Sequence, residues 1–377
     1  MQWKKNAAAL LIVLTLVLAF FPRGPKAEAE GLMVSGSRLP VTFTLPDDWD
    51  GKYLVEEDGF NGGDCLSVFH RESHEKEGSG LLFSLVTYSD SSYVTVPHYQ
   101  AVGVLSDGSR SLNLIAEMPS DVQAASDCFE DYFSLYSDET FGEIFKTLKG
   151  TGGWALLPVD EEALYAANAR FEYSNALYIG RAFNELPDGS EIIPEDWDAK
   201  MENNSFAVYD VNGDGREELL ISVEDSYVAA MRMVVYHMKE SGLEEELMVF
   251  PAVIFYGEGL VQAFDSHNHT NGEAWPYTLL LYNPEQQLYE AYASVYSWNR
   301  EYAENDYNGT PFPASADADS NGVVYCIRTF GDHPVEKWVD DAEFSAWETE
   351  QFGDRTVLDV PWMAYTEENI EAVMNAS

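Results

Sequence analysis

Basic residues are scarce in this chain, and their scarcity excludes several classes of partner. The sequence has 21 lysines and arginines against 65 aspartates and glutamates, which gives a formal net charge of −44 at pH 7. A surface of this sign repels nucleic acid and anionic lipid, because both are negatively charged. Metal cations, basic peptides and cationic polymers remain favoured, although solubility outside the cell is the simpler explanation. Intrinsic disorder is a poor explanation, because 46% hydrophobic and 14% aromatic residues suffice for packed cores.

Cysteine is scarce as well. The three cysteines are Cys65, Cys128 and Cys326. Their odd number argues against a disulfide framework, although secretion permits bridges and the first two could share a domain. Cys326 falls in a strand-like run at residues 323–330, where a free thiol packs as a small hydrophobic side chain. Whether Cys65 and Cys128 pair stays open at this point.

Long apolar runs are missing from the sequence beyond its N-terminus. Residues 7–21 form an apolar run that follows Lys4 and Lys5 and is shorter than the ~20 residues of a comfortable membrane span. Ala27-Glu28-Ala29 then offers small residues at a cleavage site. This order predicts a signal peptide over residues 1–29. It also predicts a secreted or cell-wall-associated protein with no stable membrane span after cleavage.

Recognisable catalytic motifs are missing from the sequence. It has no Walker loop, no dinucleotide fingerprint and no G-x-S-x-G frame. His70 and His74 have the spacing of a zinc-hydrolase helix, but an arginine stands where the catalytic glutamate belongs, so residues 71–80 are expected to form a charged loop. His267 and His269 could share a strand face and hold zinc. Without an identifiable third ligand, a structural or exposed role is favoured for that pair.

Oxygen-bearing side chains recur at alternate positions in one segment. It reads Asp210-Val211-Asn212-Gly213-Asp214-Gly215-Arg216-Glu217-Glu218. Calcium is a hard cation that takes roughly 6–8 oxygen ligands and tolerates irregular geometry, so a tight turn with this spacing suits it. We assign as ligands the side chains of Asp210, Asn212, Asp214 and Glu218 and the backbone carbonyl of Arg216. A solvated turn without a metal is the alternative, and a bound ion is expected to act structurally.

This segment differs from an EF-hand. An EF-hand loop carries a bidentate glutamate at its twelfth position, where this segment has Ile221. The residues on both sides read as extended strands, with Phe206 and Val208 before the loop and Leu220 after it. The segment therefore predicts a metal-binding loop between two antiparallel strands.

The segment resembles the DxDxDGxxEL hairpins of FG-GAP and VCBS-type repeats. In that family the first, third, fifth and ninth loop residues bind calcium. They correspond here to Asp210, Asn212, Asp214 and Glu218. Such repeats occur several to a chain and build a propeller, whereas this sequence has a single recognisable copy. A lone copy is similar to those of uncharacterised secreted proteins of Gram-positive anaerobes.

Size and loop composition predict two domains. The break falls at residues 150–153, a glycine-rich loop. Residues 30–150 form the first expected domain and residues 151–377 the second, which contains the calcium hairpin and a β-meander. Strands combined with helices predict the α+β class for both, each a mainly antiparallel sheet with a few packed helices. The segment at 43–49 and the last helix of the first domain resemble the PsbP-like fold.

Apolar periodicity predicts two substantial helices. The first is expected over residues 139–149 with Asp138 as its N-cap. Its core face consists of Phe141, Ile144, Phe145 and Leu148. The second is expected over Glu161–Phe183. Its core face is expected to consist of Leu164, Ala167, Phe171, Ala176 and Ile179. Two short helices are expected to close the chain, one near Ala342–Gln351 and one with Thr366 as its N-cap.

Together these features predict a secreted, acidic, non-enzymatic protein with one structural calcium site and a role in extracellular or cell-wall binding. Its partner is expected to be an extracellular ligand of cationic or carbohydrate character. Aromatic residues with acids are typical of carbohydrate- or peptide-binding faces, although ordinary sheet packing is the favoured explanation for the aromatic residues here. The rival hypothesis is a secreted hydrolase that acts on a glycan or peptide through two carboxylates. Acids are so numerous that no pair can be singled out. A metal-dependent activity centred on His267 and His269 is the third hypothesis.

Overall fold

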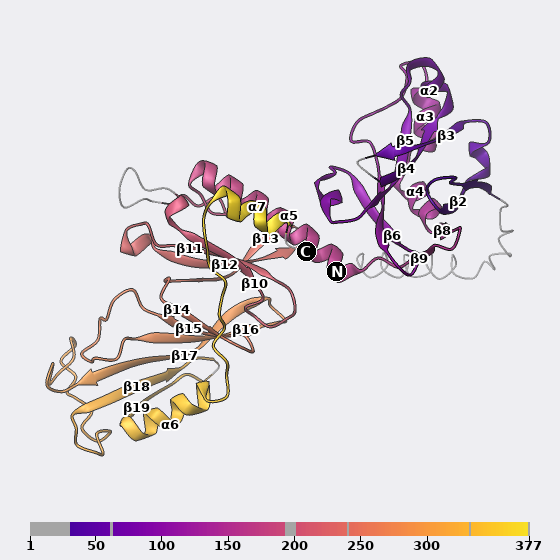
Figure 1. Cartoon of the computed structure of the whole chain (residues 1–377). Coiled ribbons are helices and arrows are strands. Elements are labelled where there is room, and N and C mark those ends of the chain that lie inside the picture. Colours follow the sequence, from indigo (N-terminus) through magenta and orange to yellow (C-terminus); the bar gives the residue numbers. More distant parts are fainter. Residues whose placement is uncertain (1–30, 61–62, 193–200, 240, 332, 376–377) are drawn as a thin grey trace, which may run out of the picture. The chain divides into compact units, whose positions relative to one another are not determined.

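The computed structural model describes residues 31–60, 63–192, 201–239, 241–331 and 333–375 (Figure 1). The expected signal peptide, residues 1–29, lies outside the described residues. Contacts within the chain group into two compact units that divide between Asp160 and Glu161. Each unit is described by itself.

The first unit combines short strands with three short α-helices in its described part. Its elements are β1 (Leu32–Ser35), β2 (Val41–Leu45), β3 (Tyr53–Phe60), β4 (Gly63–His70), α2 (Arg71–Glu77), β5 (Leu81–Tyr88), β6 (Tyr99–Ser106), β7 (Ser111–Glu117), α3 (Phe129–Leu135), α4 (Asp138–Phe145), β8 (Lys149–Gly150) and β9 (Ala155–Leu157). The strands form one sheet in the order β3-β4-β5-β7-β6-β9 and a smaller one in the order β1-β2-β8. Every described pairing in it is antiparallel.

Helix α4 closes the core of the first unit. Its four expected core residues are all buried, as predicted. The ring of Phe83 on β5 packs edge-on against Phe141 and Phe145, at centroid distances of 5.4 and 5.2 Å. The N-cap is Ser137 rather than Asp138, since the Ser137 hydroxyl accepts the N–H of Thr140. The helix ends earlier than expected because Lys149 pairs with β2.

Two further differences from the sequence prediction concern local structure in the first unit. Residues Arg71–Glu77 form helix α2 instead of a charged loop, because the imidazole of His70 caps it by accepting the Ser73 N–H. Strand β9 pairs with β6, Leu157 opposite Val104. The contacts of this unit therefore extend about ten residues beyond position 150, the boundary expected from the glycine-rich loop.

The second unit contains two larger sheets and three α-helices in its described part. Its elements are α5 (Glu161–Phe183), β10 (Ser205–Tyr209), β11 (Glu218–Val223), β12 (Arg232–Lys239), β13 (Gly242–Val249), β14 (Val253–Tyr256), β15 (Leu260–Phe264), β16 (Tyr277–Asn283), β17 (Leu288–Asn299), β18 (Val323–Thr329), β19 (Val335–Val339), α6 (Asp341–Phe352), β20 (Met363–Ala364) and α7 (Glu367–Asn375). One sheet has the order β13-β12-β11-β10-β20, and the other runs from β14 to β19 in sequence order.

The two sheets of this unit are stacked, and helices cover their outer faces (Figure 1). Alternate residues of β11 point into two different hydrophobic cores, one on each face of the sheet. Leu219 and Ile221 pack with α5 and α7, whereas Leu220 packs with residues of the opposite sheet such as Val261. Phe344 on α6 packs against the outer face of the second sheet. Strand β11 is therefore buried on both faces along its whole length.

Helix α5 has the predicted bounds but a different buried face. Its buried residues are Ala169, Tyr173, Ser174, Leu177 and Gly180. The expected core residue Ile179 is 51% exposed. Two close approaches determine the rotation of the helix: Tyr173 donates its hydroxyl to the Glu217 carbonyl at 2.7 Å, and the Tyr365 hydroxyl lies where a Cβ on Gly180 would stand.

The predicted α+β class is confirmed, since every described strand pair is antiparallel and helices pack on the sheets. The predicted helix after Thr366 is also confirmed, with the Thr366 hydroxyl accepting the N–H of Asn369. Within the described ranges, no helix is both long and apolar enough to cross a membrane.

The three cysteines are free and buried. Burial raises the pKa of Cys326 to about 11. We expect the folded protein at pH 8 to resist alkylation at Cys326, because the reactive species is the thiolate and the side chain is fully covered. Peptide mass spectrometry after iodoacetamide treatment checks this, with protein in guanidinium chloride as the control in which all three thiols react. Rapid labelling of Cys326 in the folded protein would contradict the packing.

Candidate metal centre

The segment from Asp210 to Glu218 forms the turn of a β-hairpin, as the extended flanks predicted. Strands β10 and β11 are antiparallel neighbours, and Tyr209 stands opposite Glu218. Gly213 and Gly215 have φ angles of 81° and 92°, in the left-handed region that glycine adopts without strain. The two glycines therefore let the chain turn back on itself between the strands.

Side-chain oxygens within the turn hold its backbone. The carboxylate of Asp210 accepts the N–H groups of Gly213 and Gly215 at 2.7 and 3.0 Å. The carboxylate of Asp214 accepts the N–H of Arg216 at 2.8 Å. Such bonds between short polar side chains and nearby backbone amides favour a turn over continued strand. The loop curvature is thus set by the same residues that carry the charge.

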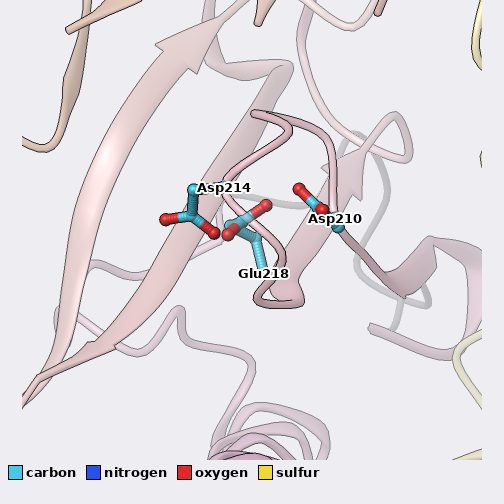
Figure 2. Close-up of side chains that lie close together, drawn as sticks. All are labelled: Asp210, Asp214 and Glu218. Atoms are coloured by element: carbon cyan, nitrogen blue, oxygen red, sulfur yellow. The ribbon is translucent and has the colours of Figure 1, made fainter. Parts of the chain in front are cut away.

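Three carboxylates gather inside this turn. Asp210, Asp214 and Glu218 each offer an oxygen, and these oxygens lie within 4.8 Å of one another. Figure 2 shows the three side chains facing one another across the loop. A group of this size and composition could hold a metal ion. Its donors are oxygens, the atoms that hard divalent cations prefer.

Glu218 is the buried member of the group. It is 1% exposed, because it begins a strand that is covered on both faces and its side chain shares the inner face with Leu220. Its two oxygens accept the Val211 N–H and the Asn212 amide, each at 3.0 Å. Burial first, and the neighbouring Glu246 carboxylate second, raise the pKa of Glu218 to about 9.

Asn212 is buried at 5% exposure and faces the glutamates with its amide nitrogen. Its Oδ1 atom accepts the N–H of Asp214 at 2.8 Å, so the oxygen turns toward the loop backbone. The side chain of Arg216 leads away from the carboxylates: its guanidinium lies 4.2 Å from the ring centre of Tyr165 and 3.4 Å from Glu162. Arg216 can therefore offer a metal ion in the loop only the oxygen of its backbone carbonyl.

The nearby arginines neutralise other acids. Arg170 makes two bonds to the carboxylate of Glu217, at 2.9 and 3.1 Å, and Arg216 pairs with Glu162. Among the described residues, the ion pairs include none between a lysine or arginine and any of Asp210, Asp214 or Glu218. The negative charge of the three carboxylates is thus not compensated by a nearby basic side chain.

The structure adds one acid that the sequence did not reveal. Glu246 is 4% exposed and lies 3.4 Å from the amide nitrogen of Asn212, behind Glu218. It is the extra residue of a β-bulge: Val235 pairs with Leu247 and Tyr236 with Glu245, which leaves Glu246 unpaired. A bulge redirects one side chain without ending the strand. In the sequence, Glu246 is one of three consecutive glutamates with no feature that distinguishes it.

Two more buried polar side chains surround Glu246. The Nδ1 atom of His237 lies 3.0 Å from its carboxylate, although the ring is not aligned for a hydrogen bond. The hydroxyl of Tyr289 on β17 also has no hydrogen-bond partner in the described part of the chain. Burial, then Glu246 and Glu218, raise the pKa of that hydroxyl above its usual range. The carboxylates of Glu246 and Glu218 therefore act electrostatically on a side chain of the opposite sheet as well.

The histidine pair considered from the sequence lies elsewhere and does not form a comparable cluster. The rings of His267 and His269 are 6.0 Å apart, and the side chain of His269 is 58% exposed. Its nearest acid is Asp265, at 3.5 Å. Among the described residues, the group that could hold a metal ion consists of the hairpin carboxylates, and these histidines are not part of it. His70 caps a helix and bonds to Asp131 at 3.0 Å.

The hairpin loop rests on the turn between β14 and β15. A Cβ on Gly259 would lie 3.0 Å from the Asn212 carbonyl oxygen and 2.7 Å from the Cβ of Tyr282. The φ of Gly259 is 66°, again in the left-handed region. Only glycine at this position lets the loop and the second sheet approach so closely.

We expect Gly259→Ala to destabilise the second unit more than Gly189→Ala does. Both positions have positive φ, so each substitution costs about 1–2 kcal/mol in backbone strain. A Cβ at Gly189 meets open space, whereas one at Gly259 adds a clash that typically costs a further ~1–3 kcal/mol. Urea unfolding of the two variants measures the difference. Equal losses of unfolding free energy in the two variants would show that the loop does not pack closely against this turn.

Comparison of the chain with protein-family models, curated proteins and solved structures found no match. The geometry and chemistry of the carboxylate cluster are therefore the guide to function.

Proposed function

We propose that the hairpin loop binds calcium, and that the ion serves as a structural clip in a secreted, acidic, non-enzymatic binding protein. The observation that carries the proposal is the burial of Glu218 beside two further carboxylates, with no lysine or arginine among the described residues paired to the group. A buried carboxylate is costly unless it is neutralised. A divalent cation supplies that neutralisation at the point where the three oxygens converge.

The donor chemistry favours calcium over other common metals. Zinc prefers nitrogen and sulfur ligands, and the cluster contains only carboxylates. Magnesium requires a strict octahedral arrangement, whereas calcium accepts irregular sites with many oxygens. We assign the ligand set as the side chains of Asp210, Asn212, Asp214 and Glu218. The carbonyl of Arg216 completes it, and rotation of the Asn212 amide brings its oxygen to the ion.

A structural role fits the position of the loop better than catalysis does. The loop joins β10 to β11 and lies against the turn of the opposite sheet, so a bound ion would fix the shape of a loop that contacts that sheet. A hydrolase acting through two carboxylates needs them in a cleft that admits substrate. Glu218 and Glu246 are the buried acids of this region, and neither lines the cavities of about 510, 490 or 360 Å³.

The extracellular part of the proposal is supported by the N-terminal sequence and by the charge. Lys4 and Lys5, the apolar run and the small residues before position 30 have the order of a secretory signal. Calcium is abundant outside cells, where sites of modest affinity are filled. Binding to an extracellular or cell-wall ligand is the role we propose for the whole protein.

Calcium is expected to raise the melting temperature of the second unit. Metal at a hundredfold excess over its Kd stabilises the folded state by about 2.7 kcal/mol. For a unit of this size, at roughly 2–4 °C per kcal/mol, that corresponds to about 5–11 °C. Calorimetry in EDTA, calcium, magnesium and zinc measures the shift. An unchanged midpoint after complete calcium removal would refute the structural role, and a larger shift with zinc would refute the assignment of the metal.

Substitution of neighbouring glutamates separates the metal site from general electrostatics. Glu218→Gln should lose the calcium shift, yet in EDTA it should melt at or above the wild-type temperature, because glutamine is already neutral, whereas Glu218, with its raised pKa, must take up a proton on folding when no metal neutralises it. Glu217→Gln is the matched control. It should keep the calcium shift and lose up to about 1 kcal/mol, since it breaks the partly exposed pair with Arg170. Loss of the calcium response in both variants would argue against a site centred on Glu218.

A further inference from the structure

A second feature of the same unit lies away from the hairpin loop, among the strands β17, β18 and β19. A cavity of about 360 Å³ opens there, within the size range of small-ligand sites. Its lining combines four aromatic rings with polar side chains of both charges. The aromatic members are Tyr296, Trp298, Tyr307 and Trp338.

The aromatic wall of the cavity is rigid. The ring of Trp338 packs edge-on against Tyr296 and Trp298, at centroid distances of 5.4 and 5.7 Å. Trp298 is 5% exposed and donates its indole N–H to the Ala303 carbonyl at 2.8 Å. The rings therefore present fixed apolar surfaces, and a ligand would meet them with little loss of side-chain entropy.

Tyr307 lies at the rim of the cavity and is fully exposed to solvent, with an exposed fraction of 102%. It belongs to a tight turn that is held by the Asp306 carboxylate, which accepts the N–H groups of Asn308 and Thr310 at 2.8 and 2.7 Å. The Thr310 carbonyl in turn accepts the Asp306 N–H at 2.8 Å. The hydrogen-bonded turn thus keeps the ring of Tyr307 exposed to solvent at the edge of the aromatic cavity.

The polar part of the lining holds few charged groups. Arg328 is oriented by Glu336, with bonds at 3.2 and 2.7 Å, so its charge is already paired. Asp306 supplies a negative charge, and Asn271 and Asn308 contribute amide groups that can donate and accept hydrogen bonds. A neutral ligand suits the cavity, while the surrounding acids disfavour an anionic one.

We propose that this cavity binds a neutral oligosaccharide. A pyranose ring has an apolar face of C–H groups and an edge of hydroxyls. The rings of Trp338 and Tyr307 suit the first, and planar amide, carboxylate and guanidinium groups suit the second. A purely apolar ligand would make no use of the amide and carboxylate groups in the lining.

Titration of the full secreted chain with neutral hexasaccharides of glucose and of N-acetylglucosamine tests the proposal, in calcium-containing buffer. Tryptophan fluorescence reports binding directly, because Trp298 and Trp338 line the cavity, and calorimetry gives the affinity. We expect saturable binding of at least one neutral probe and none of hyaluronan or of a polylysine peptide. Absence of binding by both neutral probes at millimolar concentration, or binding of the peptide alone, would overturn the proposal.

Substitution of an exposed tyrosine identifies the site without endangering the fold. Tyr307→Ala is expected to weaken binding of the hexasaccharide by roughly tenfold, because one stacking face is lost. Tyr227→Ala is the matched control, since Tyr227 is 55% exposed and does not line the cavity. Asn308→Ala should weaken binding as well. Equal affinity of Tyr307→Ala and wild-type protein would place any sugar binding elsewhere and overturn the assignment.

Discussion

The second unit depends on one constraint: a glutamate begins a strand that is buried on both faces. Glu218 cannot point to solvent, since β11 is covered by α5 and α7 on one side and by the second sheet on the other. Its carboxylate must be satisfied within the interior. The N–H of Val211 and the amide of Asn212 donate hydrogen bonds to it, but burial still disfavours the charged form, as its raised pKa shows, so a proton or a cation has to neutralise it. The tight turn before the strand then adds two more carboxylates to the same small volume.

Several features of the unit meet around that carboxylate. The bulge in β13 brings Glu246, with His237 beside it, to the back of Asn212. Arg170 holds the adjacent Glu217 outward, and Tyr173 binds the Glu217 carbonyl, so α5 is anchored to the same hairpin. A cation in the loop would therefore reinforce contacts that already connect the helix layer and both sheets.

The hairpin and the three carboxylates that meet in it could be predicted because their information is local. Alternating oxygen-bearing residues, two glycines and extended flanks lie within one short segment, and each has its own backbone consequence. Helix α5 was predicted with the correct bounds for the same reason. The buried face of this helix was not predicted. Ile179 and Leu177 are both apolar, and only the contacts of the helix with Tyr365 and the hairpin decide which of them is buried. The capping role of His70 was missed because a histidine cap has no strong pattern of its own.

By itself, the sequence determined the α+β class, the turn with its carboxylates at fixed spacing, and the excess of negative charge, since each depends on residue type or on neighbours along the chain. Only the tertiary structure decided that Glu218 is buried and that Glu246 lies behind it. Only the tertiary structure gathered aromatic residues of β17 and β19 with the turn at Tyr307 around one cavity. Burial and convergence depend on which strands pair and which faces are covered, and those arise from contacts between residues far apart in the sequence.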